Sequence, residues 1–132
     1  MDTAAAAQRW ASTLRAAWPA LDVDSFLALY AEEAHFRGPF SPPEPATEHM
    51  RRSLTLGEPG PAVWVGEPLV SGDRATVEWW AVIVISGEPV TFAATSWLHF
   101  GADGLVVDEH DYWQSKPGSF EPWPGWGVSS AA

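Results

Sequence analysis

The chain has 132 residues, of which 46% are hydrophobic and nine are tryptophan, so one folded domain with a sizeable core is expected. Its formal net charge is −10, from 17 acidic and 7 basic residues, which argues against a nucleic-acid partner. The absence of cysteine excludes disulfides, thiolate catalysis and cysteine-based zinc sites.

The N-terminus and the hydropathy pattern predict a soluble protein. The first residues lack a basic segment followed by an apolar core, so no signal peptide is expected. No apolar stretch approaches the roughly 18 to 20 residues that cross a bilayer. We therefore expect a cytoplasmic protein without a membrane partner.

The first part of the chain has helical periodicity. Trp10, Leu14 and Trp18 recur every four residues, which predicts one face of a helix that starts near Thr3 and ends before Pro19. Two further helices are predicted. They extend from a cap at Asp22 or Asp24 to Glu33–Ala34, and from Ala46 to Leu54.

The segments around the third helix are predicted to be extended or irregular. His35–Phe40 reads as a short extended piece that ends at glycine and proline, and a proline-rich loop follows it. Residues 56–61 form another turn-rich connector.

From residue 62 onward the pattern changes to strands separated by hairpin-type turns. The predicted strands are Ala62–Val70, Arg74–Ile85, Val90–Phe100 and Leu105–Trp113. Residues 116–126 are irregular and rich in proline, glycine and tryptophan, and residues 128–132 are expected to fray. Helices followed by an antiparallel meander predict an α+β fold, with helices on one face of a curved sheet. We expect one domain over residues 1–132, with its core at about 8–115.

The last predicted strand carries acidic side chains among apolar ones. Because side chains alternate along a strand, Glu109 and Asp111 share a face with Trp113, whereas His110 faces the other way. A buried charge without a partner is costly, so these carboxyl groups are expected to be paired, protonated or at the edge of a cavity.

The strand Arg74–Ile85 has one interior acid, Glu78. We expect it to face inward together with Trp80, with Trp79 on the outer face. If Glu78 and Asp111 face one cavity, repulsion and burial would raise one pKa and produce a general acid or base. Trp97 is also predicted on the outer face, where a dimer contact is expected.

The extended piece after the second helix places His35 and Arg37 on one face. Arg37 could stabilise an oxyanion, and His35 could transfer a proton. A purely structural ion pair of Arg37 with Glu78 or Asp111 is left open as the alternative. No metal site is expected, because histidines at ligand spacing and cysteines are lacking, and no G-x-S-x-G motif marks a nucleophilic serine.

The order of these elements resembles the nuclear transport factor 2-like superfamily, in particular the SnoaL-like polyketide cyclases and limonene-epoxide-hydrolase-like enzymes. The resemblance covers about residues 8–115. The segments that carry it are Asp24–Ala34, His35–Pro39, Gly72–Ala75 with Glu78–Trp80, and Phe100–Val106.

This resemblance implies a cone-shaped, curved antiparallel or mixed sheet with about three N-terminal helices around a deep pocket, commonly in a homodimer. Asp111 falls where these enzymes keep a catalytic acid/base aspartate. His35 and Arg37 fall where the hydrolases place a water-binding tyrosine and asparagine, and Glu78 and Trp80 where they keep an arginine and a second aspartate. The hydrolase relay is not reproduced, although Glu78, Arg37 and Asp111 could form a rearranged set.

We therefore expect a cofactor-independent enzyme that cyclises, isomerises or dehydrates a hydrophobic polyketide-like or aromatic carbonyl compound by acid/base chemistry. The expected catalytic residues are Asp111, His35, Arg37 and Glu78. The expected substrate-binding residues are Tyr30, Trp64, Trp80, Phe92, Ser96, Glu109 and Trp113. An epoxide hydrolase and a non-catalytic binding or assembly module are the alternatives.

Overall fold

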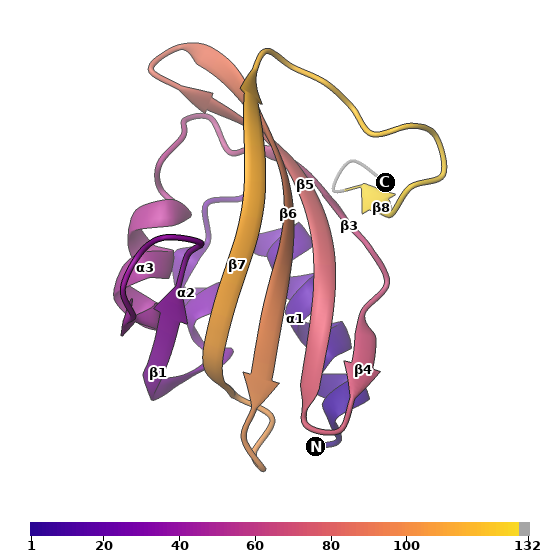
Figure 1. Cartoon of the computed structure of the whole chain (residues 1–132). Helices are drawn as coiled ribbons and strands as arrows, with labels where there is room; N and C mark the ends of the chain where they lie inside the picture. Colours follow the sequence, from indigo (N-terminus) through magenta and orange to yellow (C-terminus); the bar gives the residue numbers. More distant parts are fainter. Residues whose placement is uncertain (130–132) are drawn as a thin grey trace.

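Three helices pack against one face of a large curved sheet in the computed structural model, which describes residues 1–129 (Figure 1). The helices are α1 (Thr3–Ala17), α2 (Val23–Leu27) and α3 (Ala46–Ser53). We call the face they cover the inner face and the opposite face the outer face. The expected α+β class is confirmed. No helix among the described residues is long and apolar enough to cross a membrane.

The first two helices begin at aspartate caps. Asp2 Oδ1 accepts a hydrogen bond from the Ala5 amide at 2.7 Å, and Asp22 accepts one from the Ser25 amide. Helix α1 buries an apolar stripe that includes Trp10, and α2 buries Phe26 completely. The helices therefore form and dock because their apolar faces are removed from water by the sheet.

The sheet is mixed, in the order β2-β1-β7-β6-β5-β3-β8, with β4 beside β5. Its strands are β1 (Tyr30–Arg37), β2 (Glu44–Pro45), β3 (Ala62–Val65), β4 (Leu69–Ser71), β5 (Arg74–Ile85), β6 (Glu88–Phe100), β7 (Val106–Pro117) and β8 (Val128–Ser129). Strand β1 runs parallel to β7, and the other pairs are antiparallel.

Two predicted elements are wrong. The second helix ends at Leu27, not at Glu33–Ala34, because the chain extends from Tyr30 onward and pairs with β7, which is distant in sequence. The predicted strand Ala62–Val70 is two strands, since Pro68 lacks an N–H group and interrupts the pairing with β5. Of the tail that was expected to fray, residues 128–129 form β8, and residues 130–132 lie outside the described residues.

The register of the three long strands decides which side chains face inward. Ser96 on β6 pairs with Val77 on β5 and with Asp111 on β7, so these three side chains share one face. Val77 and Ser96 are fully buried, which identifies this face as the inner one. Glu78 therefore faces outward, contrary to the prediction.

Candidate active site

A cavity lies between the helices and the inner face of the sheet. About 120 Å³ of it can be occupied by the centre of a water molecule. Its apolar lining residues are Trp10, Leu14, Trp18, Phe26, Met50, Leu54, Leu56, Trp79, Ile83, Phe92 and Trp113, and its polar ones are His49, Ser53, Ser96, Glu109 and Asp111. No lysine or arginine lines it, so a carboxylate here has no cationic partner.

The carboxyl groups of Glu109 and Asp111 lie side by side in the register of β7 and both reach this cavity. Glu109 is 1% exposed and Asp111 is 7% exposed. Ser96, directly opposite Asp111 on β6, hydrogen-bonds to this pair, and its Oγ accepts a hydrogen bond of 2.9 Å from Trp79 Nε1. The prediction that Glu109 and Asp111 face inward, and His110 outward, is confirmed in its geometry.

Tyr30 connects the carboxyl pair to helix α1. Its hydroxyl group donates a hydrogen bond of 2.5 Å to Glu109 Oε1 and accepts one of 2.9 Å from Trp10 Nε1. Trp10, Tyr30 and Glu109 thus form a buried series of hydrogen bonds in which each donor has an acceptor. This series of hydrogen bonds holds Glu109 Oε1 in position.

Burial gives the two acids different protonation states. Burial, together with repulsion by Asp111 and the hydrogen bond between the two groups, raises the pKa of Glu109 well above its usual value. Burial also raises the pKa of Asp111, from 3.8 to about 6. The increase is limited because hydrogen bonds from Glu109 and Ser96 stabilise the Asp111 carboxylate. The two acids therefore titrate as a pair, in which Glu109 is the member that holds a proton more readily. Burial and the neighbouring Glu109 raise the pKa of Tyr30, which stays neutral.

Two buried oxygen atoms define what the pair can do. Glu109 Oε2 and Asp111 Oδ1 receive no hydrogen bond from any N–H or neutral O–H group of the described residues. The proton on Glu109 supplies the missing donor between the two groups. One neighbour can thus release a proton and the other can accept one, in a cavity lined mainly by apolar side chains.

A second polar group enters the cavity from α3. His49 Nε2 lies 3.1 Å from Ser53 Oγ, and its Nδ1 lies 3.3 Å from Glu44 Oε2. The imidazole ring stacks on Phe36 at a centroid distance of 3.5 Å. Burial lowers the pKa of His49, although Glu44 opposes this. A neutral imidazole with both nitrogens engaged can act as a proton donor or acceptor at the helical wall.

Five of the eleven predicted site residues line this cavity. They are Asp111, Glu109, Ser96, Phe92 and Trp113. Tyr30 lies directly behind them through its hydrogen bond to Glu109. The structure therefore assembles a site around Asp111, but not from the neighbours that were expected.

His35 and Arg37 do not face the cavity, and this part of the prediction is wrong. They do share a face, but Phe36, between them, pairs with Glu109 and is the residue that points inward. Arg37 Nη2 instead lies 3.2 Å from His110 Nδ1 on the outer face. Neither the expected oxyanion group nor the alternative ion pair to Glu78 or Asp111 is formed.

Glu78, Trp80 and Trp64 also lie on the outer face, which corrects the predicted inward direction. Trp64 and Trp80 are direct cross-strand partners, and Val63 and Val65 on either side of Trp64 are buried. Both faces of β5 are apolar, so the strand alone did not reveal its orientation. Trp79, predicted outside, lines the cavity in their place.

Several cavity residues were not identified as site residues from the sequence. Trp10 belongs to the apolar stripe of the first helix, where a core role and a cavity role produce the same pattern. His49 and Ser53 follow each other at four-residue spacing in α3, which places them on one helix face. This spacing is the sequence pattern from which His49 and Ser53 could have been identified as neighbours in the site. Among residues 1–129, no three histidine or acidic side chains come together to hold a metal ion.

The curved mixed sheet, the three helices and the acidic inner face define an α+β protein of the nuclear transport factor 2-like class. The SnoaL-like domain matches residues 8–109, and the chain belongs to this family. No curated protein sequence matches the chain.

Solved structures with this fold include several enzymes. A putative ketosteroid isomerase from Kribbella flavida is 25% identical, with 93% of this chain and 83% of that chain covered and a TM-score of 0.60. The epoxide hydrolase/cyclase-like enzyme SalBIII, from pyran ring formation in the polyether salinomycin, is 14% identical (86% and 96% covered, TM-score 0.72). An LEH-like epoxide hydrolase from M. tuberculosis is 15% identical (85% and 82% covered, TM-score 0.64). The last two likenesses concern the fold alone.

Proposed function

We propose that this protein is an acid/base enzyme that moves protons on a small hydrophobic carbonyl compound and thereby isomerises, cyclises or dehydrates it. The observation that carries the proposal is the buried Glu109–Asp111 pair at an apolar cavity, where burial raises both pKa values and raises that of Glu109 well above its usual range. Such pairs with separated pKa values are typical of acid/base sites. The likeness to a putative ketosteroid isomerase supports the same class of chemistry.

The first step is proton abstraction from the carbon next to the carbonyl group. The Asp111 carboxylate accepts this proton, while protonated Glu109 donates its own proton to the developing enolate oxygen. The resulting Glu109 carboxylate keeps the hydrogen bond from Tyr30, which stabilises its charge. Return of a proton to another carbon gives an isomer, and attack of the enol carbon on a second carbonyl group gives a ring. Only protons move to and from the protein, so the scheme requires no cofactor.

Proton abstraction can be tested without knowledge of the natural substrate. α-Tetralone, an aromatic ketone, is incubated with the protein in heavy water, and NMR follows the exchange of its α-hydrogens for deuterium. Asp111→Asn should slow this exchange by about 100-fold or more, because the base is lost. The matched control is Asp103→Asn in the exposed turn before β7, which should exchange at the wild-type rate.

Two outcomes would contradict the proposal. One is wild-type exchange no faster than in buffer although NMR shows the ketone bound in the cavity. The other is an Asp111→Asn variant that binds the ketone and exchanges it at the wild-type rate. Either result would favour a non-catalytic binding module, which was one of the alternatives.

The acid pair also favours a second candidate, hydrolysis of an epoxide. Protonated Glu109 could protonate the epoxide oxygen while the Asp111 carboxylate activates a water molecule. The relay of Glu78, Arg37 and Asp111 that was considered from the sequence is not available, because Glu78 and Arg37 lie on the outer face. Incubation of styrene oxide in isotopically labelled water distinguishes the candidates, since only hydrolysis places the label in a diol product.

A further inference from the structure

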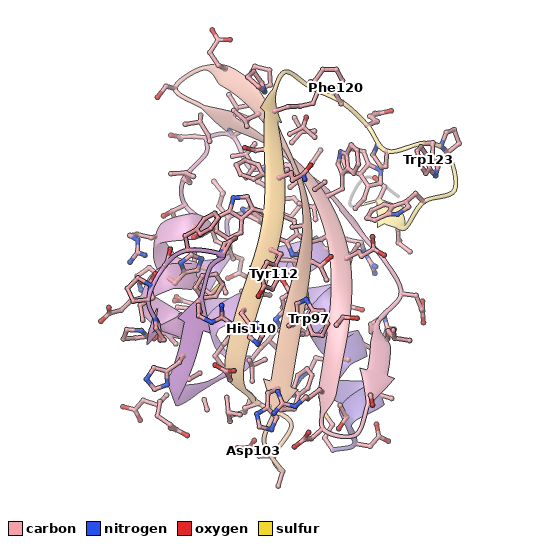
Figure 2. All side chains as sticks on the ribbon, in the orientation of Figure 1. Trp97, Asp103, His110, Tyr112, Phe120 and Trp123 are labelled. Atoms are coloured by element: carbon pink, nitrogen blue, oxygen red, sulfur yellow. The ribbon has the colours of Figure 1, made fainter. Side chains whose placement is uncertain are left out.

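A second hollow lies on the outer side of the sheet, where the C-terminal tail passes over β5. Its volume is about 290 Å³, and we call it the tail groove. Its side walls come from Trp80 on β5 and from Trp123 and Trp126 on the tail, with the carboxylates of Glu78 and Glu121 at its edge. Figure 2 shows Trp123 on the segment that leaves the end of β7 and returns to the sheet at β8.

Hydrogen bonds fix the start of the tail. The Phe120 amide donates to Thr91 Oγ1 at 3.0 Å, and Trp80 Nε1 donates to the Phe120 carbonyl oxygen at 2.8 Å. The ammonium group of Lys116 lies 4.1 Å from the centre of the Phe120 ring. These contacts hold the tail over the sheet before it reaches the groove.

The end of the tail is fixed as well. Strand β8 pairs with β3 through Val65 and Val128, and the Trp126 amide donates to the Trp123 carbonyl oxygen at 3.2 Å in the turn between. Because both ends are tied to the sheet, the tryptophans of the tail are presented in a fixed loop. A preformed loop binds a ligand with a smaller loss of conformational entropy.

The aromatic rings form an open corner rather than a closed stack. The ring centroids of Trp80 and Trp126 are 6.1 Å apart with an angle of 59° between the planes. Trp123 is 77% exposed, so most of its surface is free to contact a ligand. The Trp80 N–H is already bonded to the Phe120 carbonyl, which leaves the face of this ring for contacts. Aromatic faces carry negative electrostatic potential and attract cations.

The charged side chains that line the tail groove, Glu78 and Glu121, are both acidic. Glu78 and Glu121 are exposed, and neither forms an ion pair with any described residue. No lysine or arginine lines the groove, and the chain has a net charge of −10. An anionic ligand is therefore repelled, and a cation is attracted by both the rings and the carboxylates.

We propose that the tail groove binds a small organic cation with an alkylated ammonium group. Methyl groups on the nitrogen pack against the indole faces and carry part of the positive charge, whereas a bare ammonium group is strongly hydrated. The groove lies on the face of the sheet opposite to the Glu109–Asp111 cavity, so this proposal does not depend on the proposed function.

Choline and its uncharged carbon isostere, in which a tert-butyl group replaces the trimethylammonium group, provide the test. Both are titrated into the full-length protein while NMR follows the indole N–H signals, and calorimetry gives the affinity. Choline should shift the signals of Trp80 and Trp126 and bind roughly tenfold or more tightly than the isostere. Equal affinity of the two compounds, or no shift of these signals with choline, would overturn the proposal.

Matched variants locate the site. Trp123→Ala should weaken choline binding roughly fivefold or more, and Glu121→Gln should weaken it less and make it less sensitive to salt. Both side chains are exposed, so the fold should not be affected. The controls Phe40→Ala and Glu88→Gln remove an exposed ring and an exposed carboxylate outside the groove, and should leave choline affinity unchanged. Equal losses in the controls and in the groove variants would also overturn the proposal.

Discussion

Burial of Asp111 destabilises the folded protein at neutral pH. Its pKa rises on folding from 3.8 to about 6, so the folded state binds more protons than the unfolded state between these values. The associated stability is fully present below the unfolded pKa and is lost as the pH rises through the folded pKa. The raised pKa of Glu109 acts in the same direction at higher pH. A pair that lowers stability at physiological pH is expected at a functional site rather than at a structural one.

Replacing Asp111 by asparagine should therefore stabilise the protein in a pH-dependent way. The rise in pKa corresponds to at most roughly 3 kcal/mol, so Asp111→Asn should increase the free energy of unfolding by up to that amount at about pH 8. Below about pH 3, where wild-type Asp111 is protonated in both states, the two proteins should unfold alike. Urea denaturation at several pH values measures both quantities.

Asp103→Asn is the control for this experiment, because Asp103 lies in an exposed turn and asparagine keeps the acceptor for the Leu105 amide. It should leave the pH dependence unchanged. An Asp111→Asn variant that is less stable than wild type at about pH 8 would show instead that the carboxylate contributes to the fold.

At the scale of elements, the chain after α1 packs closely against the connector that precedes β3. A Cβ atom at Gly60 would overlap the backbone of Pro19, which neither segment can avoid by a side-chain movement. This contact holds the end of α1, and with it Trp18, over the cavity. Glycine at position 60 thus permits the close contact with Pro19 that places Trp18 at the cavity.

Gly60→Ala should destabilise the protein by about 2 kcal/mol or more, because backbone atoms must separate. Gly66→Ala is the matched control, since its Cβ would approach nothing closer than 3.4 Å and its backbone is not in a left-handed conformation. That variant should be unchanged or up to about 1 kcal/mol more stable. Thermal unfolding of both variants provides the comparison, and equal losses of stability would contradict the proposed contact.

Local patterns predicted most elements but not which way they face. The strand Arg74–Ile85 was predicted with its observed bounds, yet its inner face was assigned to Glu78 and Trp80. When both faces of a strand are apolar, the sequence does not show which face packs against the helices. Here the pairing of Val77 with the buried Ser96 on β6 determines the inner face. Asp111 was placed correctly by the period-two alternation of side chains along its strand together with the family resemblance. The first part of β1 was assigned to a helix and only His35–Arg37 were expected to be extended, because the partner strand β7 is about 75 residues away, beyond any local pattern.

At the scale of the whole molecule, the outer face of the sheet carries an exposed aromatic patch. It consists of Trp97, His110 and Tyr112, which lie together on β6 and β7 (Figure 2). Trp97 is 49% exposed and Tyr112 is 45% exposed, and the Trp97 and His110 rings stack at a centroid distance of 6.3 Å. The predicted outward direction of Trp97 is confirmed, and the homodimer expected to use this face stays a prediction. Exposed contiguous aromatic groups on one face are typical of protein–protein contacts.

The expected homodimer can be tested by changing the charge of this patch. If two copies pair through their outer faces, the wild-type protein should have the mass of two chains in light scattering, and Trp97→Glu should have the mass of one. The reason is that each copy would place a new carboxylate inside the contact, where it lacks a partner. Trp123→Glu changes the same residue type on the tail, away from the patch, and should leave the mass unchanged. A wild-type protein of single-chain mass at all concentrations, or a dimer that survives Trp97→Glu, would show that this face does not pair. Since Asp111 faces the opposite side of the sheet from Trp97, a monomeric Trp97→Glu variant should still exchange the hydrogens of α-tetralone.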